Sequence, residues 1–405
     1  MEVSWPGVVA CRGAPGPSEA GSGDIAGLIV STPSERAGAE GTGPGGRANI
    51  LPPLGHFAFL VTWQDELAAF APAPAVIIAN LAATRRWAWF ANLAITGGAI
   101  LLVGVSGLYH LFLAALGQEP PLPPAILVLA AAAAAPVLFT PVRRAITRVL
   151  PLDPDSPVGL LALVAVILIV GVQANYQASH DALAAVGAAA QLQPIDVVAQ
   201  EIPIFLIALL GVGLFTRRSL PETLDRLGIV RPTAWQICAA LAVAGLFVAL
   251  SQGAEYLQLK LDPALAHRLS QATSHYYAGI TGLFGIAAIA LAPGIAEETF
   301  FRGALQPRLG ILLAALAFAA IHTQYALTVD TLLVFTLGCG LGLVRRQLNT
   351  TAAIVSHASY NALAGIGLPD WLLGWAIATE VALVVGAVAL WYLSRRAGGI
   401  TPKPS

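Results

Sequence analysis

Charged residues are scarce in this sequence. Of its 405 residues, 11% are Asp, Glu, Lys or Arg, two are lysine, and the formal net charge is −1. Because soluble domains carry about 25% charged residues, this composition argues against a soluble globular protein. The near-zero net charge gives no support to nucleic-acid binding, which depends on a basic surface. We therefore expect no nucleic-acid partner.

Cysteine is also rare. Cys11, Cys238 and Cys339 lie far apart, and no pair has the C-x-x-C spacing. By spacing alone they can form neither a disulfide framework nor a thiolate metal site. The two lysines stand against nineteen arginines, and Ala, Gly and Pro are abundant. This bias is typical of GC-rich bacterial coding sequence, so we expect a bacterial cytoplasmic (inner) membrane as the location.

Apolar residues dominate the chain instead. Hydrophobic residues make up 57% of it, and the mean hydropathy is +0.75. Apolar stretches of about 17–25 residues recur, the length that crosses the hydrocarbon core of a bilayer. The sequence therefore predicts an all-α fold: a polytopic integral membrane helical bundle of about 8–10 transmembrane helices, surrounded by membrane lipids. It indicates nothing about the oligomeric state. Ten candidate spans are 87–116, 123–141, 157–175, 199–216, 236–254, 277–297, 309–325, 329–344, 351–367 and 371–393.

Arginines predict the orientation of these spans. They fall at alternate ends of successive spans, whereas the opposite connections carry Glu119, Asp181, Asp330 and Asp370. Arginine-rich connections stay on the cytoplasmic side of a membrane. We therefore expect both termini to be cytoplasmic. The arginines concerned are Arg85, Arg86, Arg143, Arg144, Arg148, Arg217, Arg218, Arg226, Arg231, Arg302, Arg308, Arg345, Arg346, Arg395 and Arg396.

Composition shifts suggest four regions. Residues 1–56 are rich in Gly, Pro, Ser and Ala and predict a disordered tail, or translated sequence upstream of the true start. Residues 57–198 predict an N-terminal membrane segment with about three transmembrane helices. Residues 199–367 form the expected membrane core. Residues 368–405 supply the last transmembrane helix and a short cytoplasmic tail.

Two stretches predict helices at the membrane surface. Residues 57–84 contain Asp65, Glu66, Pro72 and Pro74, which favour an interfacial helix over a clean span. Residues 217–232 are polar, with leucines at helical spacing, and favour an amphipathic helix on the cytoplasmic surface.

Two adjacent carboxylates stand at the end of an uncharged run. Glu297 and Glu298 follow Gly282–Ala296, and Arg302 lies four residues after Glu298. Ionisable groups at membrane depth cost about 3 kcal/mol or more, so they are rare and usually functional. The i,i+4 spacing predicts that Arg302 pairs with Glu298. Glu297 is rotated by about 100° and is left free to act. The alternative is an ion pair at a helix end.

Imidazole and amide groups follow on two later apolar helices. His322 comes one turn after Phe318, and His357 and Asn361 share one helix face at i,i+4 spacing. Small residues around His357 would let helices approach closely. Each motif alone fits a structural role, but three on separate apolar helices indicate a common site.

These residues fit the hydrolysis of a peptide bond. Glu297 could take a proton from a water that His322 helps to hold, while His357 and Asn361 donate to the oxyanion. Alternatively, Glu297, His322 and His357 could bind a metal such as zinc, with Glu298 as base or supporting acid. The residues themselves leave both mechanisms open.

The motifs resemble those of a known family. AEETFFRGAL, FAAIH and HASYN are similar to the EExxxR, FxxxH and HxxxN/B signatures of the CPBP family. That family includes type II CaaX prenyl endopeptidases and bacteriocin-processing or immunity proteins, historically called Abi proteins. The resemblance covers about residues 199–367. It implies an intramembrane peptidase acting on a protein or peptide, with Glu297, His322, His357 and Asn361 as catalytic groups and Glu298 and Arg302 as supporting groups. Family members are commonly labelled metalloproteases, yet a metal-free glutamate mechanism is also argued. A bacterial origin makes a prenylated substrate less plausible.

Helix counting poses a difficulty for this site. It places Glu297 near the cytoplasmic end of one span and His322 toward the far end of the next, about 15–20 Å apart in depth. We expect a kink at Pro293–Gly294 to bring them together, because proline interrupts helix hydrogen bonding. A straight segment 280–305 with the groups more than 10 Å apart would defeat the site hypothesis.

Two other functions remain open from the sequence. A non-catalytic immunity or scaffold protein could use the same polar cluster for binding, and a transporter could relay protons through it. Glu380, in the middle of the last span, belongs to no motif and is expected to have a structural partner in the bundle.

Overall fold

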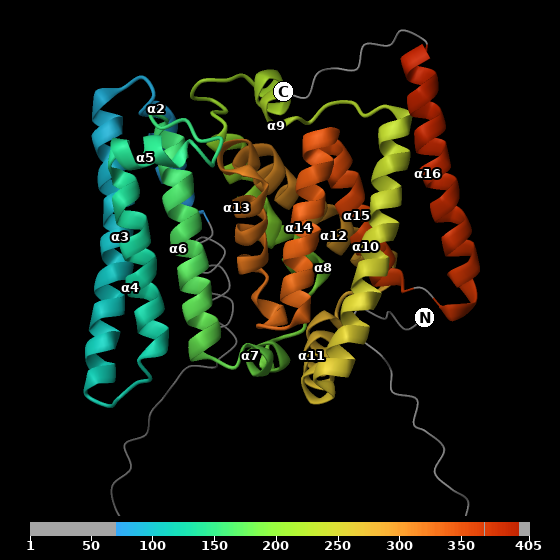
Figure 1. Ribbon diagram of the computed structural model, residues 1–405, viewed down its shortest axis with the longest axis horizontal. Helices are drawn as coiled ribbons and strands as arrows, with labels where there is room; N and C mark the ends of the chain where they lie inside the picture. Colours follow the sequence, from blue (N-terminus) through green and yellow to red (C-terminus); the bar gives the residue numbers. More distant parts are fainter. Residues whose placement is uncertain (1–69, 368, 397–405) are drawn as a thin grey trace, which may run out of the picture. The chain divides into compact units, whose positions relative to one another are not determined.

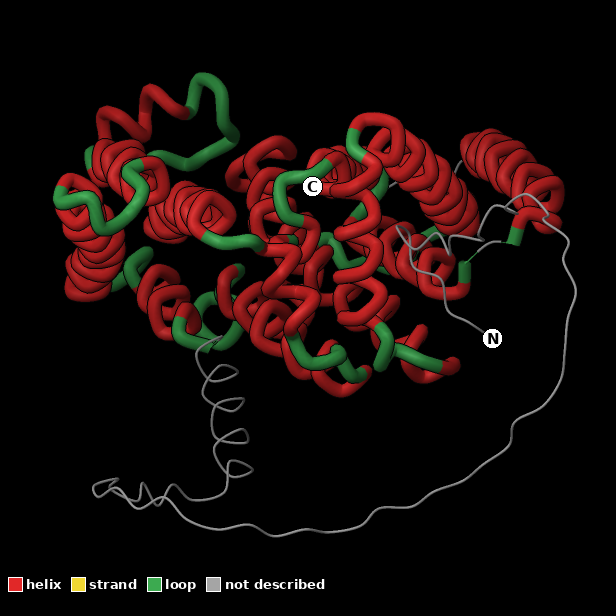
Figure 2. The backbone as a smooth tube through the Cα atoms, turned by 90° about the horizontal axis from the view of Figure 1, so that it is seen from below, coloured by secondary structure: helices red, strands yellow, loops and turns green. Residues whose placement is uncertain are grey.

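The computed structural model describes residues 70–367 and 369–396. The chain divides into two compact units, and all described residues belong to one of them. In this part of the chain there are helices and no strands, apart from an isolated bridge between Leu214 and Arg218. Figure 2 shows these helices joined mostly by short loops. The all-α prediction is confirmed. The tail expected at 1–56 lies outside the described residues.

The first helices of the described region form a group at one side of Figure 1. Their bounds are α2 Pro72–Leu81, α3 Arg86–Ala115, α4 Leu122–Ala134, the 3₁₀ turn η1 Ala135–Leu138, α5 Thr140–Ile146 and α6 Pro157–Ser179. The three spans expected within 57–198 correspond to α3, α4 with η1, and α6. Between η1 and α5 the chain bends by 100°. Arg143 holds this bend by donating to the carbonyl oxygens of Val137 and Leu138, both at 2.8 Å.

The middle of the chain alternates long and short helices. These are α7 Ala182–Ala188, α8 Pro194–Gly211, α9 Leu220–Leu227, α10 Ala234–Leu261 and α11 Pro263–Tyr277. The surface helix expected within 217–232 corresponds to α9. A capping box between Ser219 and Glu222 starts it, and Gly228 ends it in the left-handed conformation (φ 72°). Leu227 is fully buried, whereas Leu220 is exposed.

The last part of the chain carries the three sequence motifs, on α12 with η2, at the end of α13 and on α15. Its elements are α12 Gly282–Glu297, the π-helix η2 Glu298–Leu305, α13 Gln306–Ile321, the 3₁₀ turn η3 Thr323–Tyr325, α14 Val329–Gln347, α15 Thr350–Ile366, the 3₁₀ turn η4 Asp370–Leu372 and α16 Leu373–Arg396. α12 packs against α8 and α15, and α10 packs against α15 and α16.

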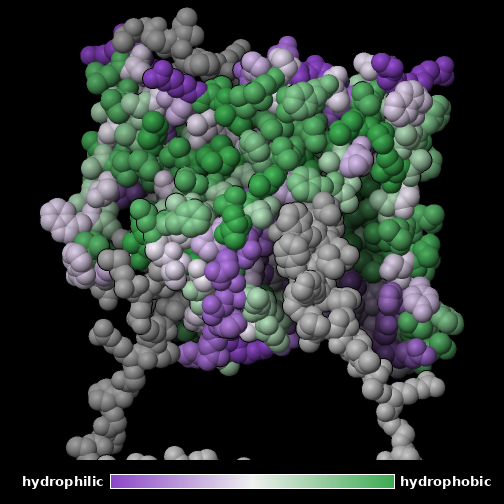
Figure 3. All heavy atoms as spheres, turned by 180° about the vertical axis from the view of Figure 1, so that it is seen from behind, coloured by the Kyte–Doolittle hydropathy of each residue, from purple (hydrophilic) through white to green (hydrophobic). Residues whose placement is uncertain are grey.

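Six helical segments of the described residues are long and apolar enough to cross a membrane, or seven if α4–η1 and α5 form one bent span. This compares with the expected eight to ten. α14 and α15, which correspond to 329–344 and 351–367, are not among the six, and the ranges 277–297 and 309–325 fall in one segment, Gly282–Ile321. Figure 3 shows a hydrophobic band across the face, with hydrophilic residues above and below it. Large apolar side chains such as Leu102 and Leu283 are exposed, as expected of a surface in contact with lipid.

The segment Gly282–Ile321 does not run straight, because the chain turns back at Gly310. Gly310 has non-helical angles (φ 80°, ψ 174°) that suit glycine. The rings of Phe301 and Phe318 have centroids 5.3 Å apart, whereas a straight helix would separate these residues by about 25 Å. The two parts of the segment therefore lie side by side.

A kink at Pro293–Gly294 was the wrong explanation for the proximity of the motifs. α12 keeps its helical pattern through Pro293 to Glu297. The irregular stretch begins afterwards, with the π-helix at Glu298, and the reversal comes at Gly310. The site hypothesis requires a break in the helical path between Glu297 and His322. Such a break is present, but it lies after Pro293–Gly294 in the chain.

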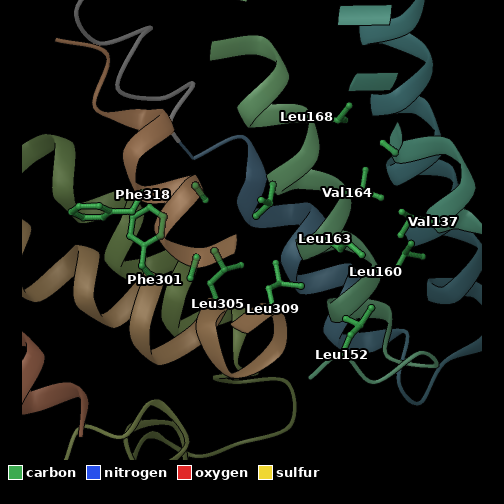
Figure 4. Close-up of a cluster of buried hydrophobic side chains, with 14 of the residues drawn as sticks. Val137, Leu152, Leu160, Leu163, Val164, Leu168, Phe301, Leu305, Leu309 and Phe318 are labelled. Carbon is green, nitrogen blue, oxygen red and sulfur yellow. The ribbon is translucent and has the colours of Figure 1, made fainter. Parts of the chain in front are cut away.

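A large apolar cluster joins the first helices to the motif-bearing segment. Figure 4 shows Phe301, Leu305, Leu309 and Phe318 on one side of the cluster. Facing them are residues of η1, α6 and the preceding loop: Val137, Leu152, Leu160, Leu163, Val164 and Leu168. Burying a leucine or phenylalanine contributes about 1.5–3 kcal/mol against water. This packing fixes η2 and α13 against α6.

The arginine-rich ends gather on one side of the unit. In Figure 1, α5, α9 and the last residues of α16 lie at the upper end, while α7 and α11 lie at the lower end. Arg345, at the end of α14, contacts Gly228 beside α9. Arg302, counted with these arginines in the sequence, is instead fully buried. Which end faces the cytoplasm stays a prediction from the arginine pattern.

Candidate functional site

The two carboxylates of the first motif are buried at the junction of α12 and η2. Glu297 is 5% exposed and Glu298 is fully buried. α12 approaches α15 closely here, because a Cβ atom on Gly294 would lie 3.0 Å from that of Ala358. The small residues around His357 thus allow the expected close helix contact.

Glu298 is held by a cation and an imidazole. Arg302 Nε lies 3.2 Å from Glu298 Oε2, and His357 Nδ1 lies 3.0 Å from Glu298 Oε1. The guanidinium of Arg302 also lies over the Phe318 ring, 4.6 Å from its centroid. The predicted pairing of Arg302 with Glu298 is present, and it leaves Glu297 without this cation at ion-pair distance.

Glu297 faces both histidines. Its Oε1 lies 3.8 Å from His322 Nε2, and its Oε2 lies 3.9 Å from His357 Nε2. These distances exceed a direct hydrogen bond. Glu297 Oε2 is buried and has no hydrogen-bond partner among the described residues. The separation between the motifs is far below the 10 Å that would have defeated the site hypothesis.

The hydrogen bonds of the two histidines indicate how each ring is protonated. His322 Nδ1 lies 2.7 Å from the carbonyl oxygen of Phe318, an acceptor, so Nδ1 carries the proton. His357 Nδ1 similarly faces the Glu298 carboxylate. In a neutral ring, each Nε2 then offers a lone pair toward Glu297. If His357 takes a second proton, its Nε2 becomes a donor.

Asn361 forms a hydrogen bond with a backbone carbonyl that has no donor within its own helix because of a proline. Its Nδ2 donates to the carbonyl oxygen of Ile289 at 3.1 Å. In a regular helix this carbonyl would accept from residue 293, but Pro293 has no N–H. One hydrogen of the Asn361 amide is thereby engaged, and the second remains for another acceptor.

The site opens on a cavity of about 560 Å³. Glu297, His322, His357 and Asn361 all line it, and other wall residues come from α7, α11 and η3. These elements lie at the end opposite α9 (Figure 1). The cavity therefore extends away from the arginine-rich end.

The expected position of the site near the cytoplasmic face stays a prediction. The chain reverses at Gly310, which lies up to about 20 Å beyond Glu297 at 1.5 Å per residue. The depth of Glu297 therefore depends on where this turn lies relative to the membrane surface.

Glu201 of α8 was missed in the sequence. It lines the same cavity as Glu297, and its Oε2 is buried without a hydrogen-bond partner in the described structure. A single glutamate in an apolar helix has no spacing partner that would mark it. The only sequence feature that could have marked Glu201 as functional is its place within an apolar helix. Glu380 has the same feature, so it does not distinguish the two glutamates.

The site carries more acid than base. Three carboxyl groups, those of Glu201, Glu297 and Glu298, lie in the site with only one guanidinium, that of Arg302. Uncompensated negative charge is unfavourable in a low-dielectric interior. Protons, a charged imidazole or a bound cation must therefore offset the excess.

The residues around Glu297 resemble a metal site in the orientation of their histidines but not in the arrangement of the whole set. Each histidine has Nδ1 fixed by an acceptor and Nε2 directed at Glu297, the arrangement that orients metal-bound imidazoles. However, no three or more His, Cys, Asp or Glu side chains among the described residues are arranged to hold a metal ion. Zinc binding by Glu297, His322 and His357 stays a prediction.

Glu380 lies elsewhere. It is on α16, and its carboxylate occupies the space beside Gly245 of α10, where a Cβ atom would collide with it. It does not belong to the cavity wall. This contact agrees with the structural partner expected in the bundle.

Comparison with known proteins identifies the segment that carries the site. Residues 279–363 match the family model described as Rce1-like, type II CAAX prenyl endopeptidase Rce1-like. The match includes all six predicted site residues and confirms the resemblance to the CPBP family. It supports a protease, and together with the apolar helices it indicates an integral membrane protein. Searches of curated proteins and of solved structures gave no match.

Proposed function

We propose that this protein is an intramembrane endopeptidase that hydrolyses a peptide bond inside the bilayer. The observation that carries the proposal is the position of Glu297 between His322 Nε2 and His357 Nε2 on the wall of one cavity. The Rce1-like segment supports the same activity. A packing role alone would not require three ionisable groups with unfilled hydrogen-bonding capacity at one cavity.

Glu297 and His322 activate the attacking water. A water that donates to Glu297 Oε1 and His322 Nε2 spans their 3.8 Å separation. Glu297 accepts one proton as the water oxygen attacks the substrate carbonyl carbon. The π bond of the carbonyl opens, and its electron pair moves to the oxygen.

His357 and Asn361 stabilise the oxyanion that results. Asn361 donates the amide hydrogen not engaged by Ile289. His357, whose Nδ1 lies 3.0 Å from the Glu298 carboxylate, donates from Nε2 when both of its ring nitrogens carry a proton. Such donors contribute about 10²–10³-fold to the rate. Glu297 then passes its proton to the leaving nitrogen, the oxyanion re-forms the carbonyl π bond, and the C–N bond breaks to give a carboxylic acid and an amine.

We propose a bacterial cytoplasmic membrane as the location, with both termini in the cytoplasm. The arginine-rich ends support this orientation. The cavity then extends toward the non-cytoplasmic side, where α7 and α11 lie. The substrate is a protein or peptide segment that enters the membrane.

Comparative analysis of protein termini tests the function. Membranes from cells that produce the wild type or Glu297→Gln are compared by mass spectrometry. New termini that require Glu297 support the protease, and Glu380→Gln serves as a control for loss of an intramembrane carboxylate. Identical termini in the wild type and Glu297→Gln would favour the immunity or scaffold alternative.

A further inference from the structure

A second cavity lies on the arginine-rich side, away from the candidate active site. It measures about 560 Å³ and is lined by Arg217, Arg218, Arg226, Glu222, Asp225 and Pro307. Arg308, beside Pro307, contributes another guanidinium to the same region. These arginines come from the loop after α8, from α9 and from α13. The fold therefore gathers positive charge from distant parts of the sequence.

Neutral groups hold most of these arginines. Arg217 donates to Asn80 Oδ1 at 2.9 Å, and Arg218 donates to the carbonyl oxygen of Val212. Arg308 donates to the carbonyl oxygens of Ala304 and Gly211. Such bonds fix the guanidinium groups in place without cancelling their charge.

The two acids in the cavity wall form no direct ion pair with the arginines, although Arg218 interacts electrostatically with Glu222. Glu222 Oε2 accepts from the backbone N–H and the hydroxyl of Ser219, both at 2.8 Å, and so caps α9. Within the described structure, no carboxylate lies within the 4.0 Å ion-pair distance of Arg217, Arg218 or Arg226. The guanidinium charges are left without a direct counter-ion.

Partial burial of several arginines close together is energetically unfavourable when no anion is bound. Burial and then repulsion by Arg218 and Arg217 lower the pKa of Arg226. Burial followed by repulsion from Arg218 also lowers the pKa of Arg217. The positive-inside rule accounts for arginines on this side, but it is satisfied equally by exposed residues such as Arg346. It does not explain why arginines converge on a cavity.

We propose that this cavity binds a phosphate-bearing anion at the membrane surface. Guanidinium groups bind phosphate oxygens through pairs of charge-assisted hydrogen bonds, and basic pockets on the cytoplasmic side of transmembrane helices suit anionic headgroups. The phosphate belongs either to the headgroup of an anionic phospholipid or to a soluble phosphate compound. This inference does not depend on the protease function.

Ligand-induced stabilisation tests the proposal. The purified full-length protein in neutral detergent is titrated with dioleoyl phosphatidylglycerol, with dioleoyl phosphatidylcholine or with pyrophosphate, and its unfolding temperature is recorded. Arg226→Gln is expected to weaken binding of the phosphate ligand about tenfold or more. Arg226→Lys should retain part of it, and Arg346→Gln should bind as the wild type does.

The two sources give different results. Stabilisation by phosphatidylglycerol, and not by phosphatidylcholine, assigns the phosphate to a lipid; stabilisation by pyrophosphate without phosphatidylglycerol assigns it to a soluble compound. Without ligand, Arg226→Gln should unfold at the same temperature as the wild type or higher, because it removes a repelling charge. Equal ligand responses in the wild type and Arg226→Gln, or no response to either phosphate, would overturn the proposal.

Discussion

Asn361 donates its side-chain N–H to the carbonyl oxygen of Ile289, the carbonyl that Pro293 leaves without a helix partner. This bond ties α15 to α12 within the site. It gives Pro293 a specific role: the proline frees an acceptor, and the acceptor orients the Asn361 amide. A structural contact between helices and the proposed donation to the oxyanion are thus compatible functions of one side chain.

A double-mutant cycle separates these two functions. Asn361→Ala should lower the free energy of unfolding by about 1–3 kcal/mol, because it leaves the partly buried Ile289 carbonyl without its hydrogen-bond donor. In a Pro293→Ala background the new backbone N–H can bond that carbonyl, so the cost of Asn361→Ala should largely disappear. Peptide cleavage should remain low, since the oxyanion donor is still missing. Denaturant unfolding of the four proteins gives the coupling, and additive effects would contradict the assignment of Pro293.

Glu201 is expected to contribute to substrate binding or product release. Its unpartnered Oε2 at the cavity can accept from a substrate N–H or hold the released amine. A neutral hydrogen bond contributes about 0.5–1.5 kcal/mol, so Glu201→Gln should lower kcat/KM by up to about tenfold. Glu380→Gln should leave kcat/KM unchanged. Since glutamine is close to glutamate in size and shape, the unfolding temperature should not fall; a large loss of stability with unaltered kcat/KM would assign Glu201 a structural role instead.

Metal content distinguishes the two mechanisms that the sequence leaves open. Zinc ligation requires a lone pair on His357 Nε2, whereas oxyanion stabilisation requires a proton there. The proposed direct mechanism predicts that cleavage survives treatment with a chelator and that His322→Ala and His357→Ala contain no less zinc than the wild type. About one zinc per wild-type chain, absent from both folded variants, would instead assign the site to a metalloprotease.

An exposed ion pair at the opposite end should give a measurable pH dependence. Asp181 caps α7 and pairs with Arg268 at 2.5 Å. The backbone N–H of Ala184, followed by Arg268, lowers the pKa of Asp181. Its stabilising contribution is therefore fully present above the unfolded-state value of about 3.9 and is lost as the pH falls through the lower folded-state pKa.

Thermal unfolding at several pH values checks this contribution. Asp181→Asn should unfold at a lower temperature than the wild type at pH 7, and the difference should shrink under acidic conditions. Adding Arg268→Gln to Asp181→Asn should have little further effect, because the pair is already broken. A difference that grows on acidification would show that another group is responsible.

Local spacing predicted the contacts within each helix and the existence of one site. The i,i+4 relation gave the Glu298–Arg302 pair, and the three motifs meet at Glu297. The path that joins them could not be predicted. Gly310 follows the polar stretch Gln306-Pro307-Arg308, which marks a connection between spans but does not specify a positive φ at the glycine. Proline suggested a kink, yet Pro293 is accommodated because a distant amide replaces its hydrogen bond. The depth of the site could not be predicted for the same reason, since it depends on where the chain reverses.

The most direct test of the proposed mechanism is cleavage by Glu297→Gln in reconstituted vesicles. The substrate is one whose new terminus depends on this protein, and Glu380→Gln is the matched control. General-base and electrostatic contributions together predict a loss of at least about 1000-fold in kcat for Glu297→Gln, with its unfolding temperature unchanged. Glu380→Gln should cleave at the wild-type rate. Wild-type cleavage by folded Glu297→Gln would contradict water activation by Glu297 and, with it, the proposed active site.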